Sequence, residues 1–171
     1  MEGKIVCFSA ADNHSRANFK KTVLNCIDLN DLETKFFKID KPSNIQHVSI
    51  WGARSEKLWN ELNTNDVILF YANYQFISYG TLMCKIQSKE IAEYLWDEKA
   101  YKNLVIMSPH VKIGCSREKF WKAFNYADKF YILGLRIPFV KRQKEIVSEY
   151  GSIQAFLEYA LDLDKMDLPN F

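Results

Sequence analysis

The chain has few of the residues that build metal sites, phosphate loops and hydrolytic active sites. It contains three histidines, four scattered cysteines and six glycines that do not cluster. A zinc site needs His and Cys ligands at short spacings, and a phosphate-binding loop needs clustered glycines. Neither pattern is present, nor is a Gly-x-Ser-x-Gly nucleophile elbow. We therefore expect no metal, no cofactor and no catalytic residue, and a binding module rather than an enzyme.

Long apolar runs are also missing. No run approaches the ~20 residues that a membrane-spanning helix needs, and no charged and then apolar signal segment opens the chain. We therefore expect a cytoplasmic protein with no membrane contact. An excess of charge is lacking too, because 23 Lys and Arg against 21 Asp and Glu leave a formal charge of +2. A site for a polyanion would have to be a local basic patch.

Aromatic residues are plentiful, at 15% of the 171 residues, with 12 Phe, 9 Tyr and 4 Trp. We expect most of them in the core and a few facing a ligand. The length predicts one domain over residues 1–165, followed by a tail or linker at 166–171.

The stretch from Gln46 to Ile86 organises the chain. An alternating strand ends at Trp51 and Gly52, and a short helix with an apolar stripe follows. Val67–Ala72 and Phe76–Ile86 then read as the arms of a hairpin. Gly80, inside the second arm, indicates a bulge or the close approach of another backbone.

The flanking segments supply the remaining elements. We expect strands at Lys4–Ser9, Lys35–Ile39, Asn103–Ile113 (broken by Pro109) and within Lys129–Val140. Asp28–Thr34 reads as a connector and Lys41–Asn44 as a loop. Helices are expected from Ser15 to Ile27, from Ser88 to Trp96, after Ser116 and after Ser152, each with a serine cap. About seven strands with interspersed helices predict an α+β domain on a small, curved or barrel-like sheet.

Two groups of residues resemble the YTH and EVE domains of the PUA-like superfamily. The first is Ser49-Ile50-Trp51-Gly52 with the helix, the strand VILFYA and the hairpin after it. The second is the spacing from Trp96 to Tyr101, where YTH domains have Trp, four residues and Trp. The polar loop in VCFSAADNHSRAN lies where YTH domains place an Asn-rich loop. The resemblance covers Lys4 to Ile113, and the late strand near Leu135 fits a PUA-like barrel.

The resemblance implies a reader of N6-methyladenine that takes the extruded base into an aromatic cage. Trp51, Trp96 and Tyr101 would be the walls, and the carbonyl of Gly52 would accept the remaining N–H of the methylamino group. Asn13, with Asp12 and Asn18 as rivals, would address the ring nitrogens. Stacking contributes about 1–3 kcal/mol per base, and burial of a methyl group about 0.8 kcal/mol.

The insertion from Asp28 to Asn44 departs from the compact eukaryotic YTH pattern and favours the prokaryotic branch, which includes McrB-associated domains. That branch implies methylated DNA as the partner, with methylated RNA as the alternative. It also implies a restriction system in which an AAA+ GTPase motor and a nuclease subunit act with the domain.

Each assignment has a second interpretation that the sequence leaves open. Trp51 and Trp96 also fit core positions, as we expect for Trp59 and Trp121, whereas Tyr101 fits a pocket rim. Asp12, Asn13 and Asn18 also fit turn and capping roles. Seven basic residues are either phosphate contacts or ordinary surface charges: Arg16, Lys20, Lys21, Lys112, Arg117, Lys141 and Arg142. A nucleic-acid-modifying enzyme and a protein–protein adaptor remain the alternatives from other classes.

Overall fold

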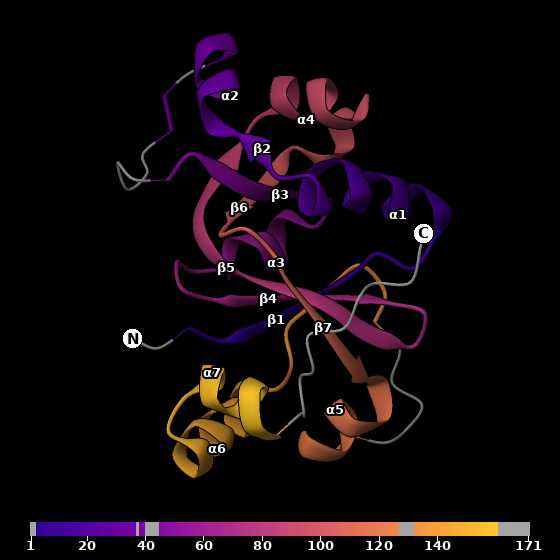
Figure 1. The fold of residues 1–171 in the computed structure, drawn as a ribbon, viewed down its shortest axis with the longest axis vertical. Coiled ribbons are helices and arrows are strands. Elements are labelled where there is room, and N and C mark those ends of the chain that lie inside the picture. Colours follow the sequence, from indigo (N-terminus) through magenta and orange to yellow (C-terminus); the bar gives the residue numbers. More distant parts are fainter. Residues whose placement is uncertain (1–2, 37, 40–44, 127–131, 161–171) are drawn as a thin grey trace.

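A computed structural model describes residues 3–36, 38–39, 45–126 and 132–160. Eight strands form one mixed sheet with helices packed on both sides (Figure 1). Its order is β2-β3-β6-β5-β4-β1-β8, and β7 pairs with β5 outside this path. The strands are β1 (Ile5–Ser9), β2 (Ile27–Asp28), β3 (His47–Ala53), β4 (Val67–Ala72), β5 (Gln75–Gln87), β6 (Asn103–Met107), β7 (Val111–Ser116) and β8 (Leu135–Arg136).

The helices are short, and most begin at a side-chain cap. They are α1 (Asn13–Phe19), the π-helix η1 (Lys20–Leu24), α2 (Leu29–Lys35), α3 (Glu56–Asn60), α4 (Lys89–Trp96), the 3-10 helix η2 (Lys99–Tyr101), α5 (Arg117–Ala123), α6 (Val140–Tyr150), α7 (Ile153–Ala155) and the π-helix η3 (Phe156–Ala160). Ser88, Ser116 and Ser152 accept backbone N–H groups at their helix starts, as expected. Among the described residues, no helix is long and apolar enough to cross a membrane.

The long strand β5 joins the two halves of the sheet. Its first part pairs with β4 and β7, and its second part pairs with β6 from Leu82 onward, with a register shift between Leu82 and Cys84. Gly80 lies near this change of partner, and a Cβ there would lie 3.1 Å from the carbonyl oxygen of Ser108. The expected close approach of another backbone at Gly80 is therefore confirmed.

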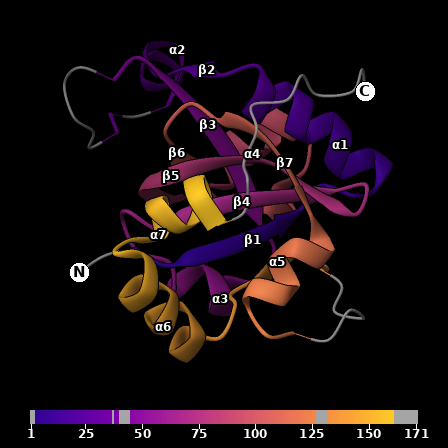
Figure 2. The same cartoon turned by 60° about the horizontal axis from the view of Figure 1, so that its bottom comes forward.

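The sheet curves around an inner apolar cluster. Strands far apart in the sheet order contribute to it, with Trp51 from β3 and Leu135 from the terminal β8, together with Phe8 and Phe70 from the strands between. Two outer clusters pack against the helices. One includes side chains from α5, α6 and α7, and the other includes side chains from α2 and α4. These two groups of helices lie apart in both views (Figures 1 and 2). The predicted α+β class with a curved sheet is confirmed.

Several expected boundaries were wrong. The segment read as a connector, Asp28–Thr34, is helix α2, because Asp28 caps it and Leu29 and Leu32 are buried on one face. The strand expected at Lys35–Ile39 is not found in its described residues, since Lys35 ends α2 and residues 36, 38 and 39 lie outside any strand. Helix α1 starts one turn earlier than predicted, with Asp12 rather than Ser15 as its cap, and its π-helical continuation ends at Leu24.

Within the described part of the predicted late strand, only Leu135 and Arg136 form a strand, and the basic run after it belongs to the unpredicted helix α6. Residue 37, the loop 41–44, residues 129–131 of the late strand and the tail 166–171 lie outside the described residues.

Candidate functional site

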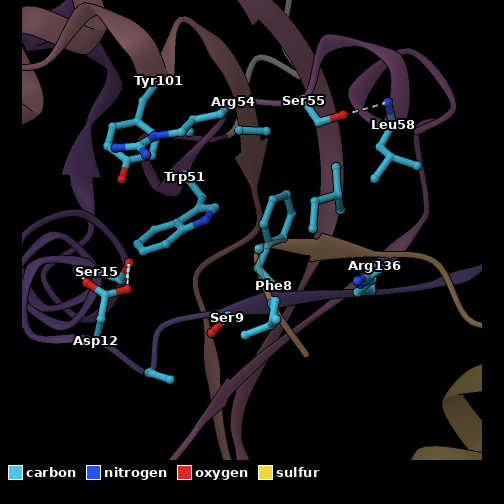
Figure 3. Close-up of a pocket in the computed structure, with 16 residues that line it drawn as sticks. Phe8, Ser9, Asp12, Ser15, Trp51, Arg54, Ser55, Leu58, Tyr101 and Arg136 are labelled. Atoms are coloured by element: carbon cyan, nitrogen blue, oxygen red, sulfur yellow. Dashed lines mark hydrogen bonds between the residues drawn. The ribbon is translucent and has the colours of Figure 1, made fainter. Parts of the chain in front are cut away.

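A cleft of about 550 Å³ opens at the end of the inner cluster (Figure 3). Its volume falls in the range of roughly 300–1,000 Å³ that is usual for ligand sites. The end of β1, the start of α1, the end of β3 and β8 meet there. Its labelled lining residues are Phe8, Ser9, Asp12, Ser15, Trp51, Arg54, Ser55, Leu58, Tyr101 and Arg136.

Trp51 is both a core residue and part of the cleft lining. Its side chain is nearly buried, at 5% exposure. Edge contacts fix the indole against Phe8 (6.4 Å between ring centroids), Phe19 (6.4 Å) and Phe70 (5.4 Å). The core and pocket interpretations of Trp51 therefore both describe its position.

A recess of about 10 Å³ lies beside the cleft, between Trp51, Trp96 and Tyr101. Gly52 makes this arrangement possible, because a Cβ at that position would lie 2.5 Å from Tyr101 Cβ and 2.8 Å from Trp96 Cζ3. Trp96 is buried, and its indole N–H donates to Thr22 Oγ1 at 3.3 Å. The recess is about the size of one water molecule or one methyl group.

Polar residues hold the half-buried Tyr101. Glu98 accepts from Arg54 Nη2 at 2.8 Å and pairs with His14 Nε2 at 3.1 Å. The Arg54 guanidinium lies over the tyrosine ring, 4.8 Å from its centroid, and the His14 imidazole stacks at 6.1 Å. Burial raises the pKa of Tyr101, so its hydroxyl is neutral and able to donate at neutral pH.

Asp12 places a carboxylate at the cleft. It accepts hydrogen bonds from the Ser15 hydroxyl at 2.6 Å and the Ser15 backbone N–H at 2.9 Å. These bonds, the hydroxyl first, lower the pKa of Asp12. The group is therefore ionised at neutral pH and accepts hydrogen bonds without donating any.

The structure brings most of the predicted base-binding residues together. Trp51, Gly52 and Tyr101 line both the cleft and the recess. Asp12 lines the cleft but not the recess. Trp96 and Asn18 line the recess but not the cleft. Asn18 Nδ2 lies 3.2 Å from His14 Nε2.

Asn13 is the exception among these residues, because it is exposed at the start of α1 and lines neither cavity. Sequence reasoning missed Phe8, Ser15, Arg54 and Arg136 at the cleft. Arg54 had a usable signal, since it comes two residues after Gly52 at the same strand end. Arg136 had none, because only the pairing of β8 with β1 brings it there.

The predicted phosphate contacts are spread over several elements. Lys20 and Lys21 are exposed on η1, Lys112 on β7 and Lys141 on α6. In both views α6 and α1 lie at opposite sides of the molecule (Figures 1 and 2).

The three arginines of that set make contacts within the protein. Arg16 donates to Asn73 Oδ1, and Arg117 lies over the ring of Tyr74. Arg142 donates to the carbonyl of Ala123, at 3.0 Å from Nη2, and pairs with Glu145. Trp121 is a core residue, as expected. Trp59 is half-buried, and its indole N–H donates to the carbonyl of Leu104 at 3.0 Å.

The chain matches no protein-family model and no curated protein sequence. Its structure is similar to the N-terminal domain of McrB from Thermococcus gammatolerans, bound to m5C DNA. The TM-score is 0.68 at 13% identity, over 86% of this chain and 96% of that one. An ASCH protein of Zymomonas mobilis scores only 0.47 at 12% identity, over 86% and 97%.

The chain therefore has the fold of the McrB N-terminal domain.

Proposed function

We propose that this chain reads a methylated base in DNA, by taking the extruded base into the cleft over Trp51. The observation that carries the proposal is the pairing of an aromatic cleft of about 550 Å³ with a methyl-sized recess that shares its walls. The shared fold supports it, because the McrB domain is bound to methylated DNA. An extruded base loses its stacking in the duplex and regains it against aromatic rings.

The lining offers the contacts that such a base needs. Trp51 supplies an apolar ring surface and Tyr101 a second wall, for about 1–3 kcal/mol of stacking. The ionised Asp12 accepts from an exocyclic amino group, which adenine and cytosine carry and thymine lacks. Arg54 and Arg136 place positive charge at the same cleft.

Within this class we propose N6-methyladenine as the base. Its methyl group sits on the amino nitrogen itself, so one edge presents both an N–H for Asp12 and a methyl group for the recess. In 5-methylcytosine the methyl group is on the neighbouring ring carbon. That base is the alternative, because the McrB domain is bound to m5C DNA.

The wider setting we propose is target recognition in a McrB-like, modification-dependent restriction system, in which a AAA+ GTPase and a nuclease act on the recognised DNA. The domain would then be an EVE- or YTH-like member of that group. Exposed Lys20 and Lys21, on η1, would contact phosphates and contribute affinity without sequence preference.

Binding to labelled oligonucleotides tests the proposal directly. Fluorescence anisotropy would compare otherwise identical strands with N6-methyladenine, 5-methylcytosine or no modification, each as DNA and as RNA. We expect methylated DNA to bind most tightly, with N6-methyladenine ahead. Preference for 5-methylcytosine would move the proposal to that base, and preference for methylated RNA to an RNA reader. Equal affinity for all strands would overturn it.

Extrusion has a separate readout. A fluorescent 2-aminopurine at the target position brightens when it leaves the stack. We expect this increase with the wild type and a much smaller one with Tyr101→Ala. Tight binding to the 2-aminopurine duplex without any increase in its fluorescence would show that the base stays stacked.

A further inference from the structure

A second cavity of about 260 Å³ adjoins the cleft. Its lining residues are Leu58, Glu61, Arg136, Ile137, Pro138, Phe139 and Val140. Leu58 and Arg136 line both cavities, so the second cavity, here called the side groove, continues from the first. The Phe139 side chain is 69% exposed and Val140 52%, and exposed apolar side chains gathered at a cavity mark a binding surface.

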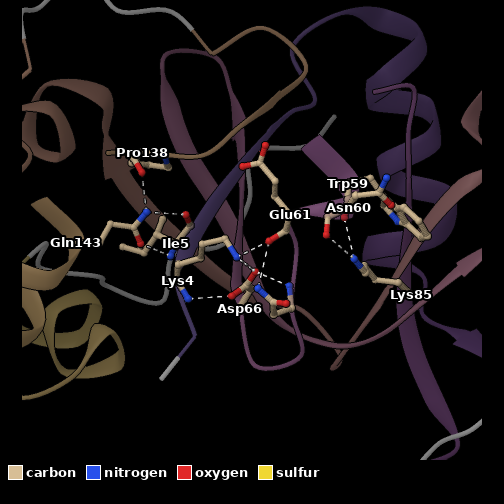
Figure 4. Close-up of polar contacts among 10 residues, drawn as sticks. Lys4, Ile5, Trp59, Asn60, Glu61, Asp66, Lys85, Pro138 and Gln143 are labelled. Atoms are coloured by element: carbon tan, nitrogen blue, oxygen red, sulfur yellow. Dashed lines mark hydrogen bonds and ion pairs between the residues drawn. The ribbon is translucent and has the colours of Figure 1, made fainter. Parts of the chain in front are cut away.

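The Phe139 wall of the side groove is held in place from below. The Phe139 backbone N–H donates to the Tyr126 hydroxyl at 2.7 Å, and the two rings meet edge to face at 5.5 Å. The carbonyl of Pro138 accepts from Gln143 Nε2 at 2.8 Å (Figure 4). Gln143 is buried at 3% exposure and also bonds both backbone groups of Ile5. The aromatic ring is thus exposed but its backbone is fixed.

The Glu61 wall, opposite Phe139, is held by Lys4, the residue just before Ile5. The Lys4 ammonium donates to the carbonyl of Glu61 at 2.8 Å and pairs with Asp66 at 2.7 Å (Figure 4). Asp66 is buried at 1% exposure and also accepts from the Asn63 backbone N–H. Successive residues of the chain, Lys4 and Ile5, therefore hold both walls of the side groove.

We propose that the side groove binds the nucleotide next to the extruded base. This inference rests on the proposed function and extends it. Extrusion of one base leaves a ring face of its neighbour unstacked, and Phe139 supplies a replacement face. Arg136, at the junction of the two cavities, pairs with the phosphate that joins the two nucleotides. Among the described residues Arg136 has no ion-pair partner, so its charge is available there.

A nucleotide fits the side groove because a cation lies between two ring-binding surfaces. Single-strand sites combine positive charge with aromatic stacking platforms in this way. The acidic Glu61 disfavours a phosphate at its own position and accepts from an exocyclic amino group, as carboxylates do with cytosine N4. The side groove therefore favours cytosine or adenine over thymine as the neighbour.

Abasic substitution next to the methylated base tests the inference. The wild type should lose about 5- to 150-fold in affinity when one neighbour, 5′ or 3′, is abasic. Phe139→Ala should lose a similar factor on the intact strand and almost nothing further on the abasic one. The matched control is Tyr74→Ala, which removes another exposed ring, 68% exposed, from the β4–β5 turn and should behave as wild type.

The outcomes separate this inference from the proposed function. A wild type that ignores methylation overturns the proposed function and with it the inference. A wild type that prefers methylated DNA but tolerates abasic neighbours on both sides overturns the inference alone. So does a folded Phe139→Ala, with wild-type thermal melting, that keeps full affinity and the full abasic penalty. Replacing the neighbour by thymine should weaken wild-type binding and leave Glu61→Gln less affected.

Discussion

Two groups of aromatic side chains in this molecule differ in how tightly their rings pack and in the residues around them. The closed cluster, under α5 and α7, consists of Phe76, Phe120, Trp121, Phe124 and Phe156. The open cluster, around Gly52, consists of Trp51, Trp96 and Tyr101. Every ring of the closed cluster is at most 2% exposed, and its closest rings approach to 4.4 Å.

The open cluster has a recess between its rings, a glycine where a side chain would clash, and charged neighbours. Trp96 and Tyr101 lie 6.0 Å apart. Glu98 and Arg54 pair beside them, whereas apolar residues surround the closed cluster. The number of aromatic rings therefore does not distinguish the candidate site from the core. The distinguishing features are the glycine and the ion pair packed against the rings.

The largest effect should come from the closed cluster and should concern stability alone. Trp121→Ala removes a ring that is 2% exposed, and such truncations cost about 3–5 kcal/mol. Urea unfolding should show that loss, while methylated-DNA binding below the unfolding transition keeps its wild-type affinity and selectivity. A changed preference for the methylated base in folded Trp121→Ala would break the division between the clusters.

Tyr101→Ala should weaken DNA binding and have little effect on stability, the opposite of Trp121→Ala. The residue is half-buried and lines both cavities, so its loss should weaken methylated-DNA binding by about 1–3 kcal/mol. The unfolding midpoint should move much less than in Trp121→Ala. Tyr101→Phe is the matched control, because it keeps the stacking ring and removes only the hydroxyl. If Tyr101→Ala binds as wild type, Tyr101 is no wall of the base site.

The same comparison shows what the sequence could predict. The members of the open cluster come from short local patterns, Trp51-Gly52 and the Trp96 to Tyr101 spacing, and such patterns can be read directly. The sequence could not show that Trp51 is also packed on three phenylalanines, because that depends on how the sheet curves. For this reason Trp51→Ala should lower both the stability and the DNA affinity, so it cannot separate a binding role of Trp51 from a structural one.

Other misses have equally physical causes. Helix α6 was hidden because its inward side includes the polar Gln143 beside Ile146, so the segment read as a basic run. The side groove requires β8 to pair with β1 across more than a hundred residues. Such long-range pairing leaves no local periodicity to detect.

The third prediction contrasts the surface charges near each cluster. Reversing Lys20 and Lys21, which are exposed on η1, should weaken binding to all DNA alike. Each lost phosphate contact lowers the magnitude of the negative slope of log K against log salt by about 0.9, so the slope should become shallower by about 2. The matched control reverses Lys122 and Lys144, which are exposed on α5 and α6, and should leave the slope unchanged. A loss confined to methylated DNA would instead place Lys20 and Lys21 in base recognition.

The smallest effect is the methyl preference itself. Burial of one methyl group contributes about 0.8 kcal/mol, which is about fourfold in affinity. Trp96→Phe should reduce that preference, because Trp96 borders the recess and the smaller ring leaves the methyl group without close contact on one side. Its control is Trp59→Phe. Each variant keeps an aromatic ring and loses one indole N–H bond, to Thr22 and to the carbonyl of Leu104 respectively.

Trp59, however, lines neither the cleft nor the recess, so Trp59→Phe should keep the fourfold ratio. Anisotropy titrations of paired methylated and unmethylated strands would give the ratio for each variant, independently of any common loss of affinity. A ratio that falls equally in both variants would indicate general loosening of the sheet. A ratio unchanged in both would separate the recess from methyl recognition. Only a fall confined to Trp96→Phe assigns the methyl group to the recess beside Gly52.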